Sequence, residues 1–228
     1  MQTYKVVEKF VSINGEGQNA GKIAAFIRFA GCNLNCSFCD TKWANEEAVP
    51  CTEETAEEIV DYIKEKNVRF VTLTGGEPLL REGMAELTRA LLEIEGLTIE
   101  YETNGSVSLA EMDAIRRAKN AEDRVLFTMD YKLLVSGMEE HMKKDNFAHL
   151  LPKDTVKFVV GSMEDLERMR KIIKAHELSY KCGLYVSPVF GKIEPADIVD
   201  YIIANELNEV TMQLQMHKFI WDPDKRGV

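Results

Sequence analysis

The stretch AAFIRFAGCNLNCSFCDT, residues 24–41, holds the two features from which the fold of this chain is inferred. Its first six residues are apolar except for Arg28 and are typical of a buried strand, which ends at Gly31. Three cysteines follow this strand directly, at positions 32, 36 and 39. Because functional groups of α/β folds gather at the carboxyl ends of parallel strands, this loop is expected to be a functional site.

Strand-like segments alternate with helix-like segments over the rest of the chain. Further strands are predicted at residues 70–74, 98–102, 125–130, 156–160, 184–187 and 210–214, with an extra N-terminal strand at 4–10. Helices are predicted where apolar residues recur on one helical face: Ala56, Ile59, Val60 and Ile63; Leu87, Leu91 and Ile94; Leu109, Met112 and Ile115; and Leu166, Met169 and Ile173. Thr52 is expected to be the N-cap of the first helix. This alternation indicates parallel βαβ units.

The predicted fold class is α/β, in the form of a partial, open βα barrel. A closed eightfold barrel takes about 250 residues, whereas this chain has 228 and uses residues 1–22 for a strand and loop extension. A doubly wound parallel sheet is the alternative fold. Because no linker-like or repeated segment is present, we expect a single domain over residues 1–228.

Composition narrows the range of partners and locations. The formal net charge of −10 and the pI near 5.0 argue against binding to nucleic acid or a membrane surface, because both carry negative charge. Lys5, Glu8 and Lys9 interrupt any signal-peptide pattern, and no apolar run approaches the ~20 residues of a membrane span. We therefore expect a cytoplasmic protein that has no nucleic-acid or membrane partner.

The spacing of the cysteine triad, Cys-x3-Cys-x2-Cys, is a metal-ligand pattern. It lets one loop wrap a cuboidal iron–sulfur cluster, with thiolates on three irons and the fourth iron open to an external ligand. A structural zinc site is the alternative, but zinc normally takes four protein ligands, often as two Cys-x2-Cys pairs. The other cysteines, Cys51 and Cys182, each lack a second ligand beside them.

With Phe38 directly before its last cysteine, the triad resembles that of the radical S-adenosylmethionine (SAM) superfamily. A second segment, Thr74 followed by Gly75-Gly76-Glu77-Pro78, resembles the superfamily's GGEP motif at the end of the next strand. The resemblance implies the superfamily's partial βα barrel and a 4Fe–4S cluster whose open iron chelates SAM. Cleavage of SAM then gives a 5′-deoxyadenosyl radical. The two glycines are expected to let the backbone approach a ligand, and Glu77 to accept hydrogen bonds from the methionine ammonium.

More of the chain resembles one family, the 7-carboxy-7-deazaguanine synthases of 7-deazapurine and queuosine biosynthesis. The similar blocks are residues 12–17, 25–32, 39–41, 102–105, 130–132, 136–138 and 214–218. The first and last blocks discriminate this family from the rest of the superfamily. The chain departs from the family pattern at Asn14, where Gln is commoner, and at Met216, where Thr is commoner.

This resemblance implies a specific reaction. The family's substrate is 6-carboxy-5,6,7,8-tetrahydropterin, from which hydrogen is abstracted at carbon 6. Ring contraction with loss of ammonia then leaves 7-carboxy-7-deazaguanine, and SAM is regenerated. Magnesium assists, held by substrate oxygens and by the hydroxyl of Thr41. The resemblance also implies a homodimer, and we expect a flavodoxin- or ferredoxin-type reductant.

The resemblance also assigns site residues, and no side chain among them is expected to be catalytic because the radical arises on the cofactor. Cys32, Cys36 and Cys39 are expected to hold the cluster. The residues expected to bind the cofactor are Phe38, Gly75, Gly76, Glu77, Thr103, Asn104, Lys132, Ser136 and Gln215. Those expected to bind the substrate are Ile13, Asn14, Gly15, Glu16, Arg28, Thr74, His217 and Lys218.

The residues themselves support some of these roles. Arg28 alternates with Ile27 and Phe29, so its side chain points away from theirs, into a barrel lumen where it would pair with the substrate carboxylate. The Glu16 carboxylate would accept paired N–H bonds from the pterin. His217 and Lys218 are predicted at the end of the last strand.

Two rival functions stay open. A glycyl-radical-enzyme activase has the same cysteine spacing but acts on a protein glycine, and the blocks around Glu16 and Lys218 argue against it. A non-enzymatic iron–sulfur electron carrier normally ligates every iron, whereas this loop offers three cysteines.

Overall fold

A computed structural model describes residues 2–46, 48–222 and 225–228. Its strands are β1 (Thr3–Ile13), β2 (Ile23–Phe29), β3 (Thr52–Thr55), β4 (Phe70–Gly75), β5 (Thr98–Thr103), β6 (Val125–Tyr131), β7 (Thr155–Val160), β8 (Gly183–Pro188) and β9 (Val210–Met212). Over these residues they form one nine-stranded sheet in the order β3-β1-β2-β4-β5-β6-β7-β8-β9. β2 and β4 to β9 are parallel, while β1 is antiparallel to both of its neighbours.

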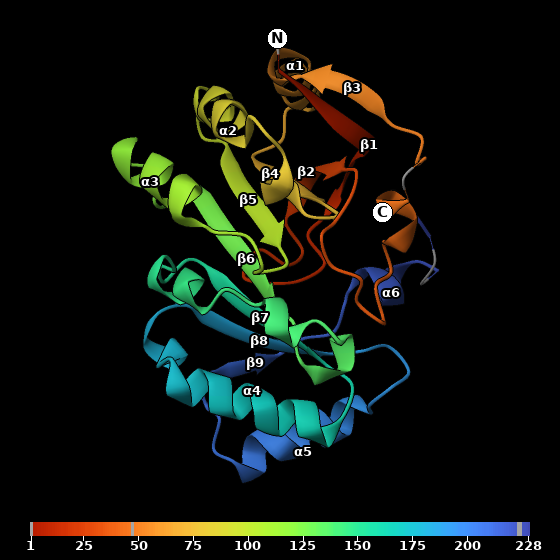
Figure 1. Cartoon of the computed structure of the whole chain (residues 1–228), viewed down its shortest axis with the longest axis vertical. Coiled ribbons are helices and arrows are strands. Elements are labelled where there is room, and N and C mark those ends of the chain that lie inside the picture. Colours follow the sequence, from red (N-terminus) through yellow and green to blue (C-terminus); the bar gives the residue numbers. More distant parts are fainter. Residues whose placement is uncertain (1, 47, 223–224) are drawn as a thin grey trace.

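Helices cover the outer face of this sheet (Figure 1). They are α1 (Ala56–Lys66), α2 (Met84–Leu92), α3 (Ala110–Ala118), α4 (Met163–Ala175) and α5 (Pro195–Ala204). The helical turns η1 (Lys42–Asn45), η2 (Pro78–Leu80), η3 (Leu134–Ser136), η4 (Glu139–His141), η5 (Lys144–Ala148) and η6 (Leu178–Tyr180) and the short helix α6 (His217–Ile220) lie in the connections. The apolar residues of α1 to α5 join one buried cluster with alternate residues of the strands. Because these helices share one face and β3 and β9 remain the free edges, the partial βα barrel is confirmed and the doubly wound sheet is wrong.

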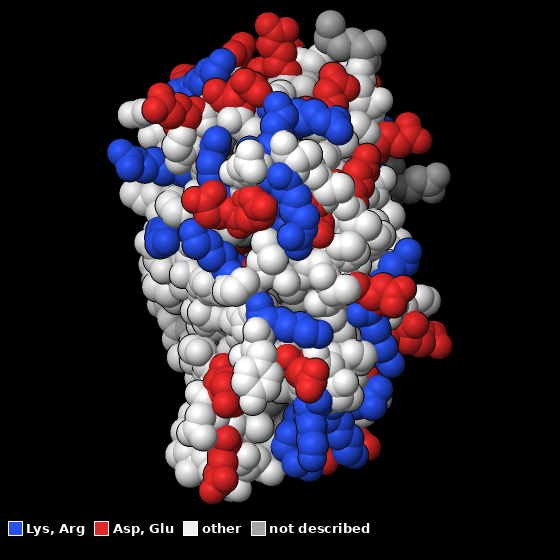
Figure 2. All heavy atoms as spheres, turned by 90° about the vertical axis from the view of Figure 1, so that its left-hand side faces the viewer, with Lys and Arg blue, Asp and Glu red and all other residues white. Residues whose placement is uncertain are grey.

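The opposite face of the sheet, which we call the lumen, is polar. Its residues alternate with those of the core and include Thr72, Thr74, Glu100, Glu102, Thr128, Asp130 and Lys157. Basic and acidic side chains are also interspersed on the exterior face shown in Figure 2, which is typical of a solvated surface. Among the helices described, none is both long and apolar enough to cross a membrane.

The N-terminal loop, residues 14–22, crosses the lumen from one side of the sheet to the other. Near its start, Asn14 accepts a hydrogen bond from the Thr72 hydroxyl at 2.8 Å. Further along, the Gly17 N–H donates to the side chain of Gln213 beyond β9, at 2.6 Å. The loop thus links β4 to the segment that follows the edge strand β9.

Three predicted boundaries are wrong. Thr52 lies in β3, and the N-cap of α1 is Thr55, whose hydroxyl accepts from the Glu58 N–H at 3.2 Å while the Glu58 carboxylate accepts from the Thr55 N–H at 2.7 Å. The last strand ends at Met212 rather than 214, because Gln213 turns its side chain toward the N-terminal loop. His217 and Lys218 therefore begin α6 instead of ending a strand. Neither β3 nor α5 was predicted.

A buried ion-pair network ties α3 to the base of the sheet. The fully buried guanidinium of Arg116 contacts Asp113 at 2.9 Å and both carboxylate oxygens of Asp154 at 3.0 Å. Asp154 also accepts hydrogen bonds from the Phe127 and Leu151 N–H groups, at 2.8 and 2.7 Å. One side chain, Arg116, thus holds a helix, a strand and the turn before β7 together.

Candidate active site

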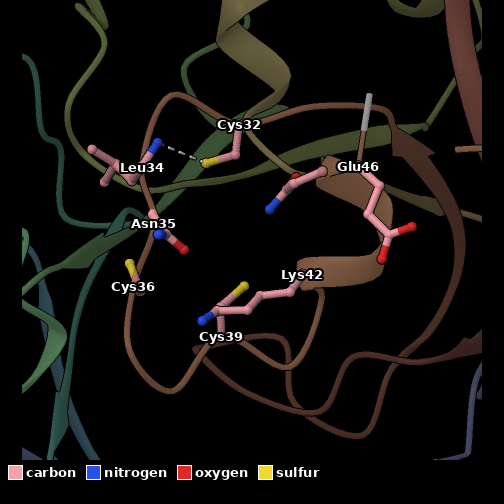
Figure 3. A pocket seen from close by; sticks show the side chains of 8 residues that line it. Cys32, Leu34, Asn35, Cys36, Cys39, Lys42 and Glu46 are labelled. Carbon is pink, nitrogen blue, oxygen red and sulfur yellow. Dashed lines mark hydrogen bonds between the residues drawn. The ribbon is translucent and has the colours of Figure 1, made fainter. Parts of the chain in front are cut away.

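The cysteines of the triad line one cavity of about 330 Å³. They lie on the loop between β2 and η1, and their sulfur atoms face the same central space (Figure 3). The other residues around this cavity are Leu34, Asn35, Lys42, Asn45 and Glu46. Cys51 is exposed, and the thiol of Cys182 lies against the Leu178 carbonyl, so neither belongs to the cavity wall.

The donor set fits a cluster better than a single zinc ion. Over the described residues, no three His, Cys, Asp or Glu side chains are placed to hold one metal ion. Zinc requires four ligands at about 2.0–2.3 Å, whereas these three sulfurs surround a space large enough for a polynuclear group. Three thiolates on one loop are the ligand supply of a cluster that keeps one iron open.

Neighbouring elements fix the cysteine loop. The Ser37 N–H donates to the carbonyl of Ser136 at 3.1 Å, and the Ser37 hydroxyl donates to the carbonyl of Val135 at 2.6 Å. On the other side, the side-chain amide of Asn104 donates to the sulfur of Cys32 at 3.4 Å. The predicted cofactor residues Ser136 and Asn104 therefore lie beside the cysteines, and Ser136 contacts the loop through its backbone.

The glycines of the GGEP segment allow a close backbone approach, but to the chain itself. A Cβ on Gly75 would lie 2.2 Å from the carbonyl oxygen of Phe29, and one on Gly76 would lie 2.0 Å from that of Gly31. The Gly76 N–H donates to Phe29 at 3.1 Å, and the next N–H to Gly31 at 3.0 Å. The glycines thus dock the end of β4 onto the start of the cysteine loop, and their predicted contact with the cofactor stays a prediction.

Glu77 is fully buried, and its carboxylate is hydrogen-bonded to groups of the protein itself. It accepts hydrogen bonds from the Leu79 N–H at 3.0 Å, the Thr103 hydroxyl at 2.9 Å and the Asn104 N–H at 2.6 Å. Burial raises the pKa of this carboxyl group, while the three bonds lower it. Glu77 therefore holds the turn after β5, and its predicted contact with the methionine ammonium stays a prediction.

Two other predicted cofactor residues lie near the cysteines. The ammonium of Lys132 lies 5.9 Å from the centroid of the Phe38 ring and 2.8 Å from the carboxylate of Asp130. Burial raises the pKa of the Cys36 thiol, and Lys132 lowers it. Lys132 thus brings positive charge to the edge of the cysteine cavity, where it suits an anionic group.

The predicted substrate residue Glu16 reaches the lumen from the N-terminal loop. Its carboxylate accepts from Lys157 at 2.8 Å, from the Ser187 hydroxyl at 3.1 Å and from the amide of Gln215 at 3.3 Å. Gln215, predicted as a cofactor residue, therefore lies beside the substrate set. β7, β8 and the segment after β9 together position this one carboxylate.

α6 closes the same region although it is not a strand end. A Cβ on Gly15 would lie 2.7 Å from Nδ1 of His217, so the ring of His217 packs directly against the backbone of the N-terminal loop. Burial lowers the pKa of His217, and Glu16 and Asp40 raise it. The ammonium of Lys218 lies 3.7 Å from Asp40, which follows the cysteine triad, so α6 brings a predicted substrate residue to the end of the cysteine loop.

Thr41 lies at the same junction. Its hydroxyl donates to the carboxylate of Asp40 at 2.9 Å. These are oxygen donors of the kind that magnesium prefers, and magnesium usually takes its remaining ligands from substrate or water. The two residues thus fit a shared magnesium site, although over the described residues they do not form a complete ligand set.

Arg28 faces the lumen as predicted, in register with Thr74, whose hydroxyl donates to Glu102 at 2.8 Å. It also has a partner that the sequence did not indicate, Glu8 of β1, whose carboxylate lies 3.3 Å from Nε. This contact uses Nε, so the terminal nitrogens of the guanidinium lie outside the ion pair.

The remaining predicted substrate residues hold the N-terminal loop. Asn14 is buried, and besides Thr72 its amide contacts Glu100 at 3.4 Å. Ile13 ends β1 opposite Ile23 and leads into this loop. Both residues therefore support Glu16 through the backbone that carries it.

Sequence reasoning missed Asp130 and Lys157, which connect the two halves of the site. Lys157 lies 2.8 Å from Glu16 and 3.6 Å from Asp130, which in turn lies 2.8 Å from Lys132. The signal for Lys157 was present, since it stands among apolar strand residues just as Arg28 does.

Glu100→Gln is expected to reduce the pH dependence of stability. Burial raises the pKa of Glu100, while bonds from Thr128 and Asn19 lower it. The folded state thus binds more protons than the unfolded state above about pH 4.3, and stability falls as pH rises through this window. Gln removes the charge: its oxygen can still accept from Asn19 and Asn14, while its NH2 group would donate to the Thr128 hydroxyl and so reverse that bond. Without the buried charge, the stability of the variant should fall less than that of the wild type between about pH 5 and pH 8. Thermal unfolding between about pH 5 and pH 8 measures this, and an identical pH slope in both proteins would contradict it.

Comparisons with known proteins agree with the geometry. The model of the radical SAM superfamily matches residues 26–131. The 7-carboxy-7-deazaguanine synthase of Clostridium acetobutylicum is 56% identical over 225 residues, which are 99% of each chain. That of Chlorobaculum tepidum is 36% identical and covers 98% of this chain and 96% of its own. Among solved structures, QueE from Escherichia coli has a TM-score of 0.74 at 22% identity, covering 94% of this chain and 95% of that one, and supports the fold.

Proposed function

Because this chain belongs to the 7-carboxy-7-deazaguanine synthase family of radical SAM enzymes, we propose that it converts 6-carboxy-5,6,7,8-tetrahydropterin to 7-carboxy-7-deazaguanine with loss of ammonia. It is an enzyme of deazapurine biosynthesis that uses a 4Fe–4S cluster and SAM. The observation that carries the proposal is the junction at α6, where the cysteine loop and the lumen residues around Glu16 meet.

On the cofactor side, Cys32, Cys36 and Cys39 hold the cluster. When bound, the cluster and SAM together supply the carbon radical that abstracts hydrogen from the substrate. Lys132 provides positive charge beside this cavity. Asn104 orients Cys32 by donating to its sulfur.

On the substrate side, the chain offers charged groups of both signs. The Glu16 carboxylate accepts N–H bonds from the pterin, and Arg28 pairs with the substrate carboxylate. Each is a charge-assisted hydrogen bond, the stronger kind, and together they fix the ring in position and orientation. His217 and Lys218 close the site from α6, and Thr41 takes part in binding magnesium.

The partners follow from the same proposal. A flavodoxin- or ferredoxin-type protein supplies the electron, the enzyme is a homodimer, and it works in the cytoplasm without nucleic acid. The net charge of −10 and the interspersed surface charge in Figure 2 support the absence of a nucleic-acid partner.

Turnover by the reconstituted enzyme tests the proposed function directly. The chain is loaded with iron and sulfide without oxygen, reduced with dithionite, and incubated with SAM, magnesium and the carboxytetrahydropterin. The expected products are 7-carboxy-7-deazaguanine and ammonia in equal amounts, with SAM not consumed in proportion. Cleavage of SAM without any change in the pterin would contradict the proposed substrate.

Glu16→Gln and Arg28→Ala should separate substrate recognition from cofactor chemistry. Charge-assisted hydrogen bonds contribute about 1.5–3 kcal/mol, so each change is expected to weaken pterin binding roughly ten- to hundredfold. Neither residue contacts the cysteine loop, so slow SAM cleavage without substrate should persist. Pterin binding and 5′-deoxyadenosine formation are measured on the same samples.

Glu54→Gln is the matched control for these variants. Glu54 is a buried carboxylate paired with Lys9 at 2.6 Å, outside the lumen. It should bind the pterin like the wild type. Normal pterin binding by Glu16→Gln or Arg28→Ala, with failure only in SAM cleavage, would contradict this division of the site.

A further inference from the structure

Lys157 is an enclosed cation of the lumen, as little exposed as Lys132. It lies on β7 between Val156 and Phe158, which are both buried in the core, and its side chain is 12% exposed. Its ammonium lies 2.8 Å from Oε2 of Glu16, a residue 141 positions earlier in the chain, and 3.6 Å from Oδ2 of Asp130. A lysine is rarely buried this far unless it is paired, so these two carboxylates account for its placement.

Lys157 is expected to stay protonated. Burial by itself lowers the pKa of Lys157, but the carboxylates of Glu16, Asp130 and Glu102 raise it well above its ordinary value. The ammonium therefore stays protonated and balances several carboxylates of the lumen. A neutral side chain at this position would leave Glu16 without the cation that lies 2.8 Å from it.

The contacts of Glu16 show what the lysine adds. Oε1 accepts from Ser187 at 3.1 Å, whereas Oε2 accepts from Lys157 at 2.8 Å and from Gln215 at 3.3 Å. Two ionised carboxylate oxygens offer about four acceptor positions. One position is thus left on Oε1, and the long Gln215 bond is the one that a ligand would most easily replace. The Lys157 bond is the shortest of the three and the only one from a charged donor, so it holds Oε2 most strongly.

The second ion pair of Lys157, with Asp130, connects it to the residues beside the cysteine cavity. Asp130 receives Lys157 and Lys132 on the same oxygen, Oδ2. Its other oxygen, Oδ1, is buried and has no hydrogen-bond partner among the described residues. Charges of alternating sign thus run from Glu16 through Lys157 and Asp130 to Lys132 beside the cysteine cavity.

We propose that Lys157 is a positioning residue, which orients the Glu16 carboxylate toward the N–H groups of the substrate. Through Asp130 it also fixes the position of this carboxylate relative to the cysteine cavity. The proposal rests on the proposed function, because it assigns Lys157 an action through Glu16. Lys157 does not touch the reacting atoms. Its removal therefore affects substrate binding, while the cluster and SAM cleavage without substrate are unchanged.

A double-mutant cycle tests this action. The dissociation constant of the carboxytetrahydropterin is measured without oxygen on the reconstituted enzyme, for wild type, Lys157→Met, Glu16→Gln and the double variant. Loss of one charge-assisted bond predicts about tenfold weaker binding for Lys157→Met. Because residues that act as a unit are not additive, adding Lys157→Met to Glu16→Gln should weaken binding by less than about twofold.

Further variants separate positioning from folding. Lys157→Arg keeps the charge and should restore binding to within about threefold of the wild type. Lys9→Met removes a lysine that pairs with Glu54 and lies over the Tyr62 ring outside the lumen, and should leave binding unchanged. If Lys157→Met does not fold, Lys157→Gln, which retains a polar side chain without the charge, carries the same expectation. Iron content and SAM cleavage without substrate should match the wild type in all of them.

The outcomes distinguish this inference from the proposed function. If the wild-type enzyme neither binds nor converts the pterin, both the proposed function and this inference are wrong. If the wild type binds the pterin, then unchanged binding by Lys157→Met, or additive effects in the cycle, overturns the positioning role alone.

Discussion

Replacing any one of Cys32, Cys36 and Cys39 with Ala is expected to abolish both the brown chromophore of the cluster and the cleavage of SAM. The three sulfurs surround one cavity, and within the described residues no other cysteine lines it, so a lost thiolate has no substitute. An incompletely ligated cluster is lost or cannot keep its open iron defined. Iron and sulfide content, absorbance and 5′-deoxyadenosine formation after reconstitution should all fall to background.

Cys51→Ala and Cys182→Ala are the matched controls. Both remove a thiol from the same chain, yet Cys51 is exposed and Cys182 contacts the Leu178 carbonyl away from the cavity. Both variants should keep wild-type iron content and cleavage. Loss of the cluster in Cys51→Ala would mean that the ligand set has been assigned wrongly.

Arg116→Met is expected to cause the largest loss of stability. It removes the fully buried guanidinium that pairs with Asp113 and with both oxygens of Asp154. Breaking a buried ion pair from one side costs about 3–5 kcal/mol, because the partner charge stays buried without compensation. Chemical unfolding of the purified protein should show a correspondingly lower free energy of unfolding.

Arg117→Met tests whether burial causes this effect. Arg117 is the next residue in α3 and also contacts Asp113, at 3.0 Å, but its side chain is 48% exposed. Exposed pairs contribute little because water screens them, so this variant should unfold almost like the wild type. Adding Asp154→Asn to Arg116→Met removes the unpaired charge and keeps an acceptor oxygen for the Phe127 N–H, so it should recover part of the loss. Equal destabilisation by Arg116→Met and Arg117→Met would contradict the explanation.

The parts of the fold that local patterns determine were predictable. Sequence patterns located eight of the nine strands described, and the cysteine spacing located the cavity that the three sulfurs line. The N-cap of α1 could also have been predicted correctly, because Thr55 followed by Glu58 is a capping-box pattern. Thr52 has no such partner. The four-residue strand β3 could not have been predicted, because its sequence TEET has no apolar face.

The roles that depend on tertiary contacts were not predictable. The tight approach of Gly76 to Gly31, and the bonds that occupy Glu77, join segments whose relation no local pattern encodes. In the same way, Arg28 was placed correctly in the lumen, but its partner Glu8 depends on the register of an antiparallel strand. Lys157 could have been proposed by the argument used for Arg28, whereas its pairing with Glu16 could not.

The path of the N-terminal loop also sets an order for biosynthesis. The contacts that hold the cysteine loop involve residues up to Ser136, so they are available once about two thirds of the chain has left the ribosome. The contacts of Glu16 become available much later, because its partners Lys157, Ser187 and Gln215 follow it by 141, 171 and 199 residues. Closing loops of this length is slow and entropically costly. We therefore expect the contacts of the cysteine loop to form during translation before those of Glu16.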